Sequence, residues 1–324
     1  MIAASFSETG PSSVIGVGEV QTPEPGPGEV RVRVAVSGVN PTDWKARSGA
    51  TDRAIAPFRI PGQDGAGTID AVGEGVDAAR IGERVWVYFA SQGRRWGTAA
   101  QFTIVAAERA VPLPDAASFE LGACLGIPAM TAYLCLVTDG PVEGRTVLVA
   151  GGAGAVGHYA IELARWMGAR VIATVSNDEK AAMAEAAGAD AVVRYREPDA
   201  IGQLAAAAPD GVDRVIELAL AANLELDLSA LNPHASIVTY ADDSGAPPQI
   251  PVRPLMLANI VLRYFLIYTM PADAVRAAAR AVNAAVAAGT LTVLPLRRFT
   301  LEQTAAAHDA VQAGAVGKVV IDVR

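Results

Sequence analysis

The sequence predicts an α/β protein in which a β-rich N-terminal part precedes a doubly wound parallel sheet. Up to about residue 120, alternating strand-like segments are separated by loops rich in Pro and Gly. From about Leu121, alanine-rich helical stretches alternate with short apolar strands. A glycine-rich turn, Gly152-x-Gly154-x-x-Gly157, directly follows one of these strands, as it does in a βαβ unit.

The N-terminal part contains three segments in which apolar residues alternate with others, as they do in half-buried strands. These segments are EVRVRVAVSGV at 29–39, GTIDAVG at 67–73 and RVWVYFA at 84–90. Clusters such as TPEPGPGE separate the strand-like segments. We therefore expect an all-β unit with long loops.

Six apolar strands with helical stretches between them predict the parallel sheet. They read VLVA at 147–150, VIATV at 171–175, AVVRY at 191–195, RVIELA at 214–219, SIVTY at 236–240 and VLRYFLIY at 261–268. The tail from residue 294 combines a strand, a helix and a last strand, and we expect it to return to the first part. The predicted domains are therefore 1–121 with 293–324, and 122–292.

The glycine turn has the spacing of a dinucleotide-binding loop. In such a unit the first glycine permits a tight turn, the second lets the backbone approach a pyrophosphate, and the third lets the helix pack on the strand. The diphosphate rests on free N–H groups at the helix N-terminus. An ordinary strand-to-helix turn is the alternative, but the helical pattern from His158 to Met167 and the strand after it favour a nucleotide.

The end of the second strand indicates which cofactor is bound. An acid about 20 residues after the motif would bind the ribose 2′-hydroxyl of NAD and repel a 2′-phosphate, but Ser176 stands there. Lys180 follows four residues later, and Tyr195 lies between two arginines at the end of the next strand. Hydroxyls and cations suit an extra phosphate, so these residues predict NADPH. Alternatively, Lys180 is a solvated first-turn residue of a helix capped by Ser176 or Asn177.

Composition and charge exclude several kinds of partner. The chain has 324 residues, 52% of them hydrophobic, and a net charge of -8, which fits a two-domain globular protein and disfavours nucleic acid or an anionic membrane. The apolar stretch 254–271 is interrupted by Arg263 and bounded by prolines, so it predicts a helix and a buried strand and not a membrane span. The two cysteines, Cys124 and Cys135, offer no disulfide framework, and the start lacks signal-peptide features, so we expect a cytoplasmic protein.

Four segments together carry a family resemblance. They are GVNPTDWKARSG at 38–49, PGQDGAGTIDAVGEGVDAARIGERVWVY at 61–88, ACLGIPAMTAY at 123–133 and the glycine motif. With GKVVI near the C-terminus, the whole chain resembles the medium-chain dehydrogenase/reductase superfamily, in its zinc-free, zeta-crystallin-like quinone oxidoreductase branch. This resemblance implies a GroES-like β-rich domain and a Rossmann domain that binds NADP.

The resemblance also implies that the protein binds no zinc. In the zinc alcohol dehydrogenases of this superfamily, the positions that match Asn40 and Gln63 carry a cysteine and a histidine ligand. Zinc prefers thiolate, imidazole and carboxylate ligands. The three histidines, His158, His234 and His308, are far from both positions in the sequence.

Without a Lewis acid, reduction of an ordinary ketone is handicapped, so we expect an acceptor that delocalises the incoming electrons itself. Quinones and α,β-unsaturated carbonyls do this, and hydride can reach them directly over roughly 3 to 3.5 Å. Lys45 and Tyr88 are the candidate groups to steady an oxyanion or donate a proton. The alternatives are a surface Lys45 paired with Asp43 and a Tyr88 that packs in the core.

The resemblance further implies the contacts of the cofactor. Asn40 should approach the nicotinamide side, and Thr131 should contact the ribose or a phosphate. The residues around Tyr240 lie at the carboxyl end of a strand, where an open α/β sheet binds its ligand. The predicted cofactor-binding residues are Asn40, Thr131, Ala153, Gly154, Ala155, Val156, Ser176, Lys180, Tyr195, Tyr240, Ala241, Phe265, Ile267 and Lys318.

These features predict a zinc-independent, NADPH-dependent oxidoreductase that reduces a quinone. Many quinone reductases of this branch carry a tyrosine where this chain has Lys45, and NPxDxK resembles the enone and alkenal reductases. Reduction of the C=C bond of an enone or enoyl thioester is therefore an alternative, and a low-turnover NADPH-binding protein is another. The resemblance favours a homodimer joined through the strand at 261–268.

Overall fold

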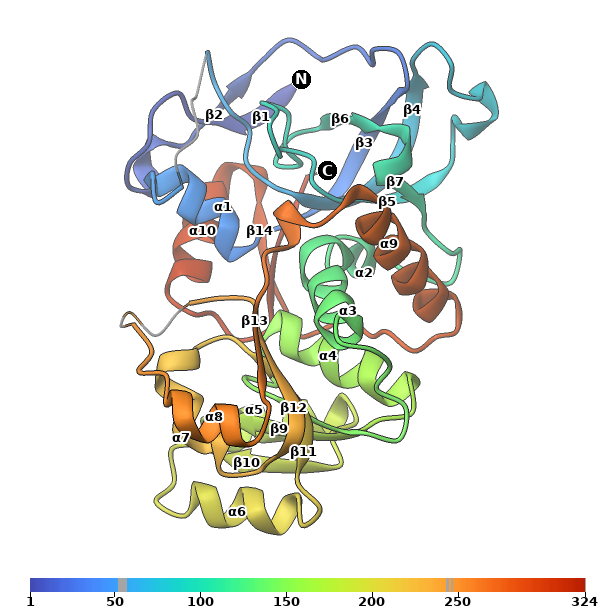
Figure 1. The fold of residues 1–324 in the computed structure, drawn as a ribbon. Coiled ribbons are helices and arrows are strands. Elements are labelled where there is room, and N and C mark those ends of the chain that lie inside the picture. The colour runs from blue at the N-terminus through green and yellow to red at the C-terminus, as the bar shows by residue number, and fades with distance from the viewer. Residues whose placement is uncertain (52–56, 243–244, 246, 324) are drawn as a thin grey trace. The chain divides into compact units, whose positions relative to one another are not determined.

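The computed structural model describes residues 1–51, 57–242, 245 and 247–323, which form two compact units. Unit 1 comprises Met1–Ile127 and Val293–Arg324, and unit 2 comprises Pro128–Thr292. The α/β fold class predicted from the sequence is confirmed, with a β-rich unit and a parallel-sheet unit (Figure 1).

Unit 1 is built on a seven-stranded mixed sheet in the order β14-β15-β3-β4-β5-β7, with β6 paired to β3 off this path. Its strands are β3 (Glu29–Gly38), β4 (Asp64–Val72), β5 (Arg84–Val87), β6 (Phe102–Ala106), β7 (Ala110–Pro112), β14 (Leu296–Thr300) and β15 (Lys318–Asp322), and a second sheet pairs β1 (Ile2–Ser5) with β2 (Gly16–Glu19). The helices are α1 (Pro41–Ser48), α2 (Phe119–Gly122) and α10 (Thr304–Gln312), with short 3-10 turns η1 (Ser12–Val14), η2 (Ala78–Arg80), η3 (Ala107–Arg109) and η6 (Leu301–Gln303). The π-helix η4 (Leu125–Ala129) contains the boundary between the units, at Pro128.

The alternation predicted for the first strands buries one set of side chains. Val30 and Val32 of β3 lie in a cluster with Ile69 and Val85. The strand predicted at 84–90 is shorter than expected, because Phe89 adopts a φ of 56°, which does not continue a β-strand.

The C-terminal segment completes this sheet. β15 pairs antiparallel with β3, and β14 pairs parallel with β15. The helix between these two strands, α10, packs beside α1 from the N-terminal part of the chain (Figure 1). The first and last segments of the chain therefore share one core.

Unit 2 contains a six-stranded sheet in the order β10-β9-β8-β11-β12-β13, and every neighbouring pair is parallel. Its strands are β8 (Thr146–Val149), β9 (Arg170–Val175), β10 (Ala191–Arg194), β11 (Val212–Glu217), β12 (Leu231–Thr239) and β13 (Val261–Tyr264). Its helices are α3 (Met130–Val137), α4 (Ala155–Trp166), α5 (Asp178–Ala186), α6 (Ala200–Ala207), α7 (Leu220–Leu228), α8 (Val252–Leu257) and α9 (Ala272–Ala287), with a turn η5 (Ile267–Thr269).

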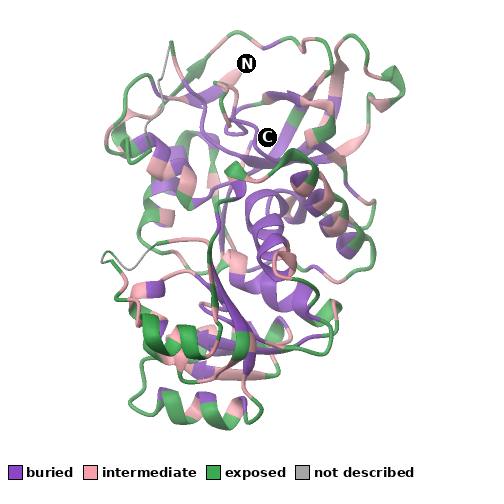
Figure 2. Cartoon of the chain, in the orientation of Figure 1, coloured by how far each residue is buried: buried purple, intermediate pink, exposed green. Residues whose placement is uncertain are grey.

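Helices cover both faces of this sheet, and successive residues of its central strands are therefore all buried. Val147, Leu148 and Val149 of β8 are inaccessible to solvent. Leu204 of α6 and Leu224 of α7 pack in the same cluster as Leu148. Helices α3 and α4 are themselves largely buried (Figure 2). The continuous apolar runs in the sequence are typical of a doubly covered parallel sheet.

The last strand of the sheet differs from its prediction. The sequence 261–268 suggested one long buried strand, but β13 ends at Tyr264 and is mostly exposed. It lies at the edge of the sheet and pairs only with β12 among the described strands. Phe265 still donates its N–H to Thr239 O, and the chain then turns into η5. The apolar composition therefore marks an uncovered edge and not a core strand.

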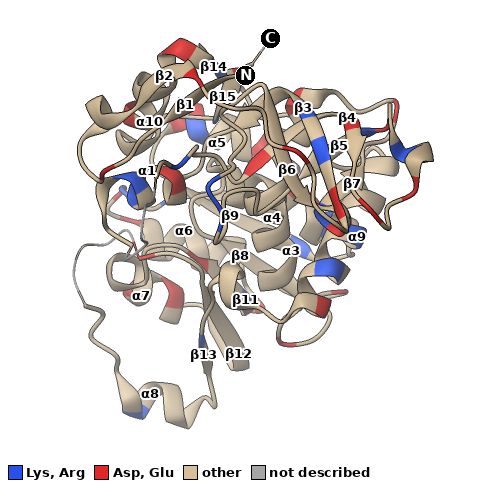
Figure 3. Ribbon diagram, turned by 90° about the horizontal axis from the view of Figure 1, so that it is seen from above, with Lys and Arg blue, Asp and Glu red and all other residues tan. Residues whose placement is uncertain are grey.

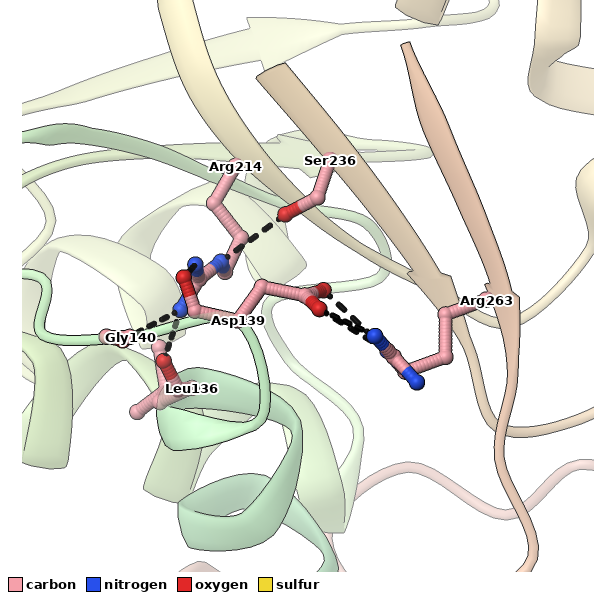
Figure 4. Close-up of polar contacts among 6 residues, drawn as sticks. All are labelled: Leu136, Asp139, Gly140, Arg214, Ser236 and Arg263. Carbon is pink, nitrogen blue, oxygen red and sulfur yellow. Dashed lines mark hydrogen bonds and ion pairs between the residues drawn. The ribbon is translucent and has the colours of Figure 1, made fainter. Parts of the chain in front are cut away.

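Arg214 ties β11 to the end of α3 (Figure 4). Its guanidinium donates to the carbonyl oxygens of Leu136, Asp139 (2.7 Å) and Gly140 (3.0 Å), and its Nε donates to Ser236 Oγ (3.0 Å). Of these acceptors, the carbonyl of Leu136 lies in the last turn of α3, where helix geometry provides no intrahelical donor. Burial lowers the pKa of Arg214, but the surrounding carbonyls compensate the buried cation.

A second, more exposed contact reaches the same loop from the edge strand. Arg263 of β13 pairs with the carboxylate of Asp139, with its Nε 3.0 Å from Oδ1 (Figure 4). The loop after α3 is therefore bound by one buried and one partly exposed arginine. Among the described residues, no helix has both the length and the apolar character needed to cross a membrane.

Candidate functional site

The glycine turn of unit 2 has the shape of an anion-binding loop. A Cβ on Gly157 would lie 2.3 Å from Gly151 O, and one on Gly152 would lie 2.8 Å from the Cβ of Ala173. These two glycines are therefore required by the close packing of α4 on the sheet. Gly154 is exposed, and its Cβ would meet only Gly151 O, at 3.3 Å. The backbone is thus open at the position where a pyrophosphate would approach.

Helix α4 begins at Ala155, with Gly154 as its N-cap. The N–H groups of Ala155 and Val156 belong to the first turn, where helix geometry provides no intrahelical acceptor. Ala153 is buried, whereas Ala155 and Val156 are partly exposed. The four predicted pyrophosphate residues therefore form one continuous turn.

The residues predicted to bind a 2′-phosphate lie together at the end of β9. The register pairs Arg194 with Val175, so Tyr195 is next to Ser176 on the neighbouring strand. Asn177 caps α5 by accepting from Lys180 N (3.0 Å), so Lys180 lies in the first turn of that helix.

The charges at this position are mixed. Arg194 donates to Asp178 Oδ1 (2.6 Å), so this arginine already has an acidic partner. The guanidinium of Arg196 lies 5.9 Å from the ring centre of Tyr195. Lys180 and Arg196 are the other two cations of this part of the sequence.

Other predicted cofactor residues of unit 2 lie at the carboxyl ends of β12 and β13. Tyr240 donates its N–H to Glu217 O (3.0 Å), and Ala241 O accepts from the hydroxyl of Thr239 (3.0 Å). Phe265 and Ile267 are buried just after β13. Thr131 is buried in the first turn of α3.

In unit 1, Asn40 and Lys318 are in direct contact. The Nζ of Lys318 donates to Asn40 Oδ1 (2.6 Å), and Asn40 Nδ2 donates to Asp64 Oδ2 (2.6 Å). Ile127 N donates to the other oxygen of Asp64 (2.9 Å). All three side chains are buried, so one amide bridges a buried ammonium group and a buried carboxylate.

Two acids of this cluster have raised pKa values. Burial raises the pKa of Asp64 to about 7, although Lys318 and the donors on its oxygens oppose the shift. Burial also raises the pKa of Asp43 to about 6. The N–H groups of Asn40 and Gly62, which donate to the Asp43 carboxylate, oppose this shift. Asp64 was not among the predicted residues, because its role depends on a segment about 60 residues away; the motif PGQDG alone suggested only Gln63.

The two candidate catalytic residues both lie against aromatic side chains. The Nζ of Lys45 lies 5.7 Å from the ring centre of Trp44, on α1. Tyr88 is buried against Trp86 and Phe89, and its hydroxyl lies 3.5 Å from Glu108 O.

The side chains at the two positions matched to zinc ligands do not suit zinc. Asn40 and Gln63 offer amide oxygens, and that of Asn40 already accepts from the ammonium of Lys318. Gln63 Oε1 is buried without a hydrogen-bond partner. Zinc would need thiolate, imidazole or carboxylate groups around it. Within the described residues, no three His, Cys, Asp or Glu side chains are grouped as metal ligands.

Unit 2 contains a buried pair of acids that the sequence did not suggest. Glu217, the last residue of β11, accepts from Leu218 N (2.7 Å), Ala219 N and Asn223 Nδ2 (3.0 Å). Burial and the neighbouring Glu217 raise the pKa of Asp227 well above its ordinary value. The pair fixes the loop after β11, whose Leu218 lies against Gly151 of the glycine turn.

Comparison with known proteins identifies the family. The model of the alcohol dehydrogenase GroES-like domain matches residues 26–115, and that of zinc-binding dehydrogenases matches residues 155–291. A quinone oxidoreductase of Sus scrofa is 30% identical over 321 residues, which is 98% of this chain and 95% of the relative. The chain belongs to the medium-chain dehydrogenase/reductase superfamily. This medium-chain reductase is an oxidoreductase of the quinone oxidoreductase type, as its resemblance predicted.

Solved structures of the superfamily have the same fold over the whole chain. A mycobacterial protein in complex with NADPH is 30% identical, with a TM-score of 0.85 and 100% of both chains covered. A structure described as an NAD-dependent alcohol dehydrogenase is 26% identical, with a TM-score of 0.91 and the same coverage. These relatives support a nicotinamide cofactor for this reductase.

Proposed function

We propose that this reductase is a zinc-independent, NADPH-dependent oxidoreductase that transfers hydride to a quinone. The observation that carries the proposal is the Lys318–Asn40–Asp64 contact, since Asn40 stands where the zinc enzymes have a cysteine ligand and its amide oxygen accepts from an ammonium group. In the proposed arrangement, unit 1 is the GroES-like substrate domain and unit 2 is the Rossmann domain. The curated quinone oxidoreductases at about 30% identity support this choice of acceptor.

The proposed cofactor contacts begin at the glycine turn. Ala153, Gly154, Ala155 and Val156 would hold the pyrophosphate, because the turn is open there and the N–H groups of the first turn of α4 are available. Thr131, Tyr240, Ala241, Phe265 and Ile267 are proposed to line the remainder of the dinucleotide, with Asn40 and Lys318 on the nicotinamide side.

The preference for NADPH rests on the end of β9. Ser176 replaces the acid that would repel a phosphate, and Lys180 and Tyr195 lie beside it. When bound, the reduced nicotinamide would supply the hydride. The protein would position the acceptor and exclude water, and Lys45 is the proposed donor to the developing oxyanion. Tyr88 is the weaker candidate, because its hydroxyl already lies near Glu108 O.

The second candidate function is reduction of an activated C=C bond. The observation that favours it is Lys45 itself, which stands where many quinone reductases carry a tyrosine. An enolate oxygen formed on an enone or enoyl thioester would be stabilised by an ammonium group at this place. The cofactor and the absence of zinc are shared by both functions.

Oxidation of NADPH with a set of acceptors tests these proposals. The purified full-length protein is assayed with 9,10-phenanthrenequinone, 1,4-benzoquinone and a panel of alkenones, before and after treatment with a zinc chelator. We expect quinone-dependent turnover that the chelator leaves unchanged. Turnover with alkenones alone would favour the second function, whereas tight NADPH binding without turnover on any acceptor would indicate a binding protein.

We also propose a homodimer formed through β13 and α8. The exposed apolar side chains of unit 2 include Val252, Met256 and Leu257 of α8 and Tyr264 of β13. Few charged residues interrupt these two elements (Figure 3). An unprotected apolar edge strand offers main-chain hydrogen bonds to a second copy.

The oligomeric state can be measured by size-exclusion chromatography with light scattering. Wild type should elute as a dimer, and Tyr264→Asp should shift the equilibrium to the monomer. Ile201→Asp, on the exposed face of α6, is the matched control because it adds the same charge to another exposed apolar position. A wild-type monomer would disprove the dimer. Cys124 and Cys135 are both buried, and a chain with only two cysteines offers no disulfide framework, so we propose a reducing compartment, the cytoplasm.

A further inference from the structure

The contact between Lys318 and Asn40 is a consequence of strand register. β15 and β3 are antiparallel, with Val320 opposite Gly38 and Ile321 opposite Ser37. Continuing this register by two residues places Lys318 opposite Asn40, just where β3 has ended. Gly317 makes the entry into β15 possible, because it has a φ of 79° and its Cβ would lie 2.1 Å from Pro295 O.

The two partners of Asn40 determine which way its amide points. An ammonium group can only donate, so Lys318 must face Oδ1, and this leaves Nδ2 to face Asp64. The opposite orientation would set the NH₂ group of Asn40 against Lys318 and its carbonyl against Asp64. The orientation with Nδ2 on Asp64 is therefore imposed by the ammonium group of Lys318.

The neighbours of Asp64 hold its carboxylate in place for this contact. Ile127 N donates to Oδ1, and Gly126 leaves room for the group, since a Cβ there would lie 2.1 Å from that oxygen. Thr98 donates its hydroxyl to Asp64 O (2.6 Å) and contacts Ser37 Oγ (2.7 Å). Hydrogen bonds thus hold both the side-chain carboxyl group and the backbone carbonyl of Asp64, which accepts from the Asn40 amide.

We propose that Lys318 is a positioning residue, which orients and polarises the Asn40 amide so that its second Nδ2–H is presented to the carbonyl oxygen of a bound ligand. Of the two hydrogens on Nδ2, one is directed to Asp64, and the other remains as a donor. A cation on the amide oxygen draws electron density from the N–H groups, and hydrogen bonds in such a chain strengthen one another. The ligand oxygen would belong to the acceptor or to the nicotinamide carboxamide.

This inference rests on the proposed function, in which Asn40 lies on the nicotinamide side. It explains why Lys318, the first residue of β15, would affect the reaction. A donor directed at an oxygen on which negative charge develops stabilises the transition state more than the ground state. Loss of Lys318 should therefore reduce the rate at saturation more than it reduces cofactor binding.

The first measurement needs no turnover. The side-chain NH₂ signals of Asn40 are recorded in ¹⁵N-labelled full-length protein and identified by their loss in Asn40→Asp. In wild type we expect one hydrogen to be shifted downfield by Asp64. Lys318→Met should move both signals toward those of free amides, and Lys318→Arg should retain the shift. Arg298→Met, which removes an exposed cation from the neighbouring strand β14, is the matched control and should leave the signals unchanged.

The second measurement is the single-turnover rate of NADPH oxidation by saturating 9,10-phenanthrenequinone. Lys318→Met should lower this rate about 10- to 100-fold and change the Kd of NADPH less than about threefold. Lys318→Arg should recover most of the loss. If Lys318→Met does not fold, Lys318→Gln is used, because it keeps a neutral donor and should lose the rate only in part.

Unchanged Asn40 signals in the Lys318→Met protein, or Lys318→Met and Lys318→Gln rates within twofold of wild type, would overturn the inference. A fall in rate that only follows a lower content of folded protein, measured by thermal unfolding, would also do so. If wild type reduces none of the acceptors, the proposed function fails, while the amide signals still decide whether Lys318 orients Asn40.

Discussion

The Nζ of Lys318 lies 2.6 Å from the Oδ1 of Asn40, across the register that joins the last strand of the chain to one of the first. A buried lysine needs an acceptor, and the buried Asp64 needs a donor; the amide between them serves both. The ammonium group of Lys318 reaches this amide only when β15 is in place beside β3. The geometry of unit 1 around Asn40 therefore depends on a residue near the C-terminus.

Lys180→Glu should weaken NADPH binding selectively. The substitution replaces a cation in the first turn of α5 with an acid beside Ser176, where a 2′-phosphate would be repelled. We expect the Kd of NADPH to rise about tenfold or more, which corresponds to about 1.4 kcal/mol, while the Kd of NADH changes less than about threefold. The change in nicotinamide fluorescence on titration measures both constants.

Arg170→Glu is the matched control for this substitution. Arg170 is exposed at the opposite end of β9, so it makes the same change in net charge away from the site. It should leave both constants unchanged. If the Lys180→Glu protein loses NADH and NADPH binding equally, or if wild type binds the two with similar affinity, the assignment of the end of β9 to a phosphate is wrong.

Substitution of Gly157 should lower stability, whereas substitution of Gly154 should weaken NADPH binding. A Cβ on Gly157 would collide with the backbone of Gly151 and Gly152, so Gly157→Ala should lower the free energy of unfolding by about 2 to 3 kcal/mol. Gly154 has a φ of -78° and a ψ of 163°, which alanine adopts readily. Gly154→Ala should therefore change stability by less than about 1 kcal/mol and still weaken NADPH binding about tenfold.

Urea unfolding and fluorescence titration of the two variants check this contrast. A Gly154→Ala protein that binds NADPH like wild type would show that no pyrophosphate approaches the turn at this residue. Full stability of the Gly157→Ala protein would show that α4 can move away from β8.

Arg214 should contribute much more to stability than Arg263, although both bind the loop after α3 (Figure 4). Arg214→Met leaves three carbonyl groups without their buried donor, and we expect a loss of about 3 kcal/mol or more. Arg263→Met breaks an ion pair in which the arginine side chain is 42% exposed, and we expect a loss of about 1 kcal/mol or less. Urea unfolding measures both, and equal losses would contradict the argument from burial.

Most of the fold could be predicted from the sequence, because local periodicity records which faces are buried. The alternation in 29–39 matches β3, and the six apolar runs match the six parallel strands. The end of β13 was missed because an exposed apolar edge strand and a buried strand have the same composition. The end of β5 was missed because a φ of 56° at Phe89 leaves no sign in hydrophobicity.

Less of the candidate site could be predicted. The glycine turn was found because its chemistry lies within six consecutive residues, and Asn40 was singled out by resemblance. Lys318 was also given by resemblance, but its contact with Asn40 spans 278 residues of sequence, and Asp64, which contacts Asn40 across 24 residues, was missed. Such contacts depend on strand register, which a pattern along one segment does not contain.

Asp227→Asn should change the way in which stability depends on pH. The pKa of Asp227 is raised, first by burial and then by Glu217, above the value of 3.8 expected in the unfolded chain. Between that value and the folded pKa, the folded protein holds a proton that the unfolded chain releases, so the free energy of unfolding falls as the pH rises. Asparagine cannot titrate, and its amide provides a permanent donor to Glu217. The Asp227→Asn protein should therefore gain stability relative to wild type as the pH increases above about 4, by up to about 1.4 kcal/mol per pH unit.

Urea unfolding at pH 4.5, 6 and 7.5 measures this gain. Asp227→Leu is the control, because it removes both the titration and the donor, and Glu217 is left without its partner in the pair. It should be less stable than Asp227→Asn at every pH, while its pH dependence is the same. A difference between wild type and Asp227→Asn that is constant from pH 4.5 to 7.5 would mean that Asp227 ionises alike in the folded and unfolded chains, and that no proton is held between the two acids.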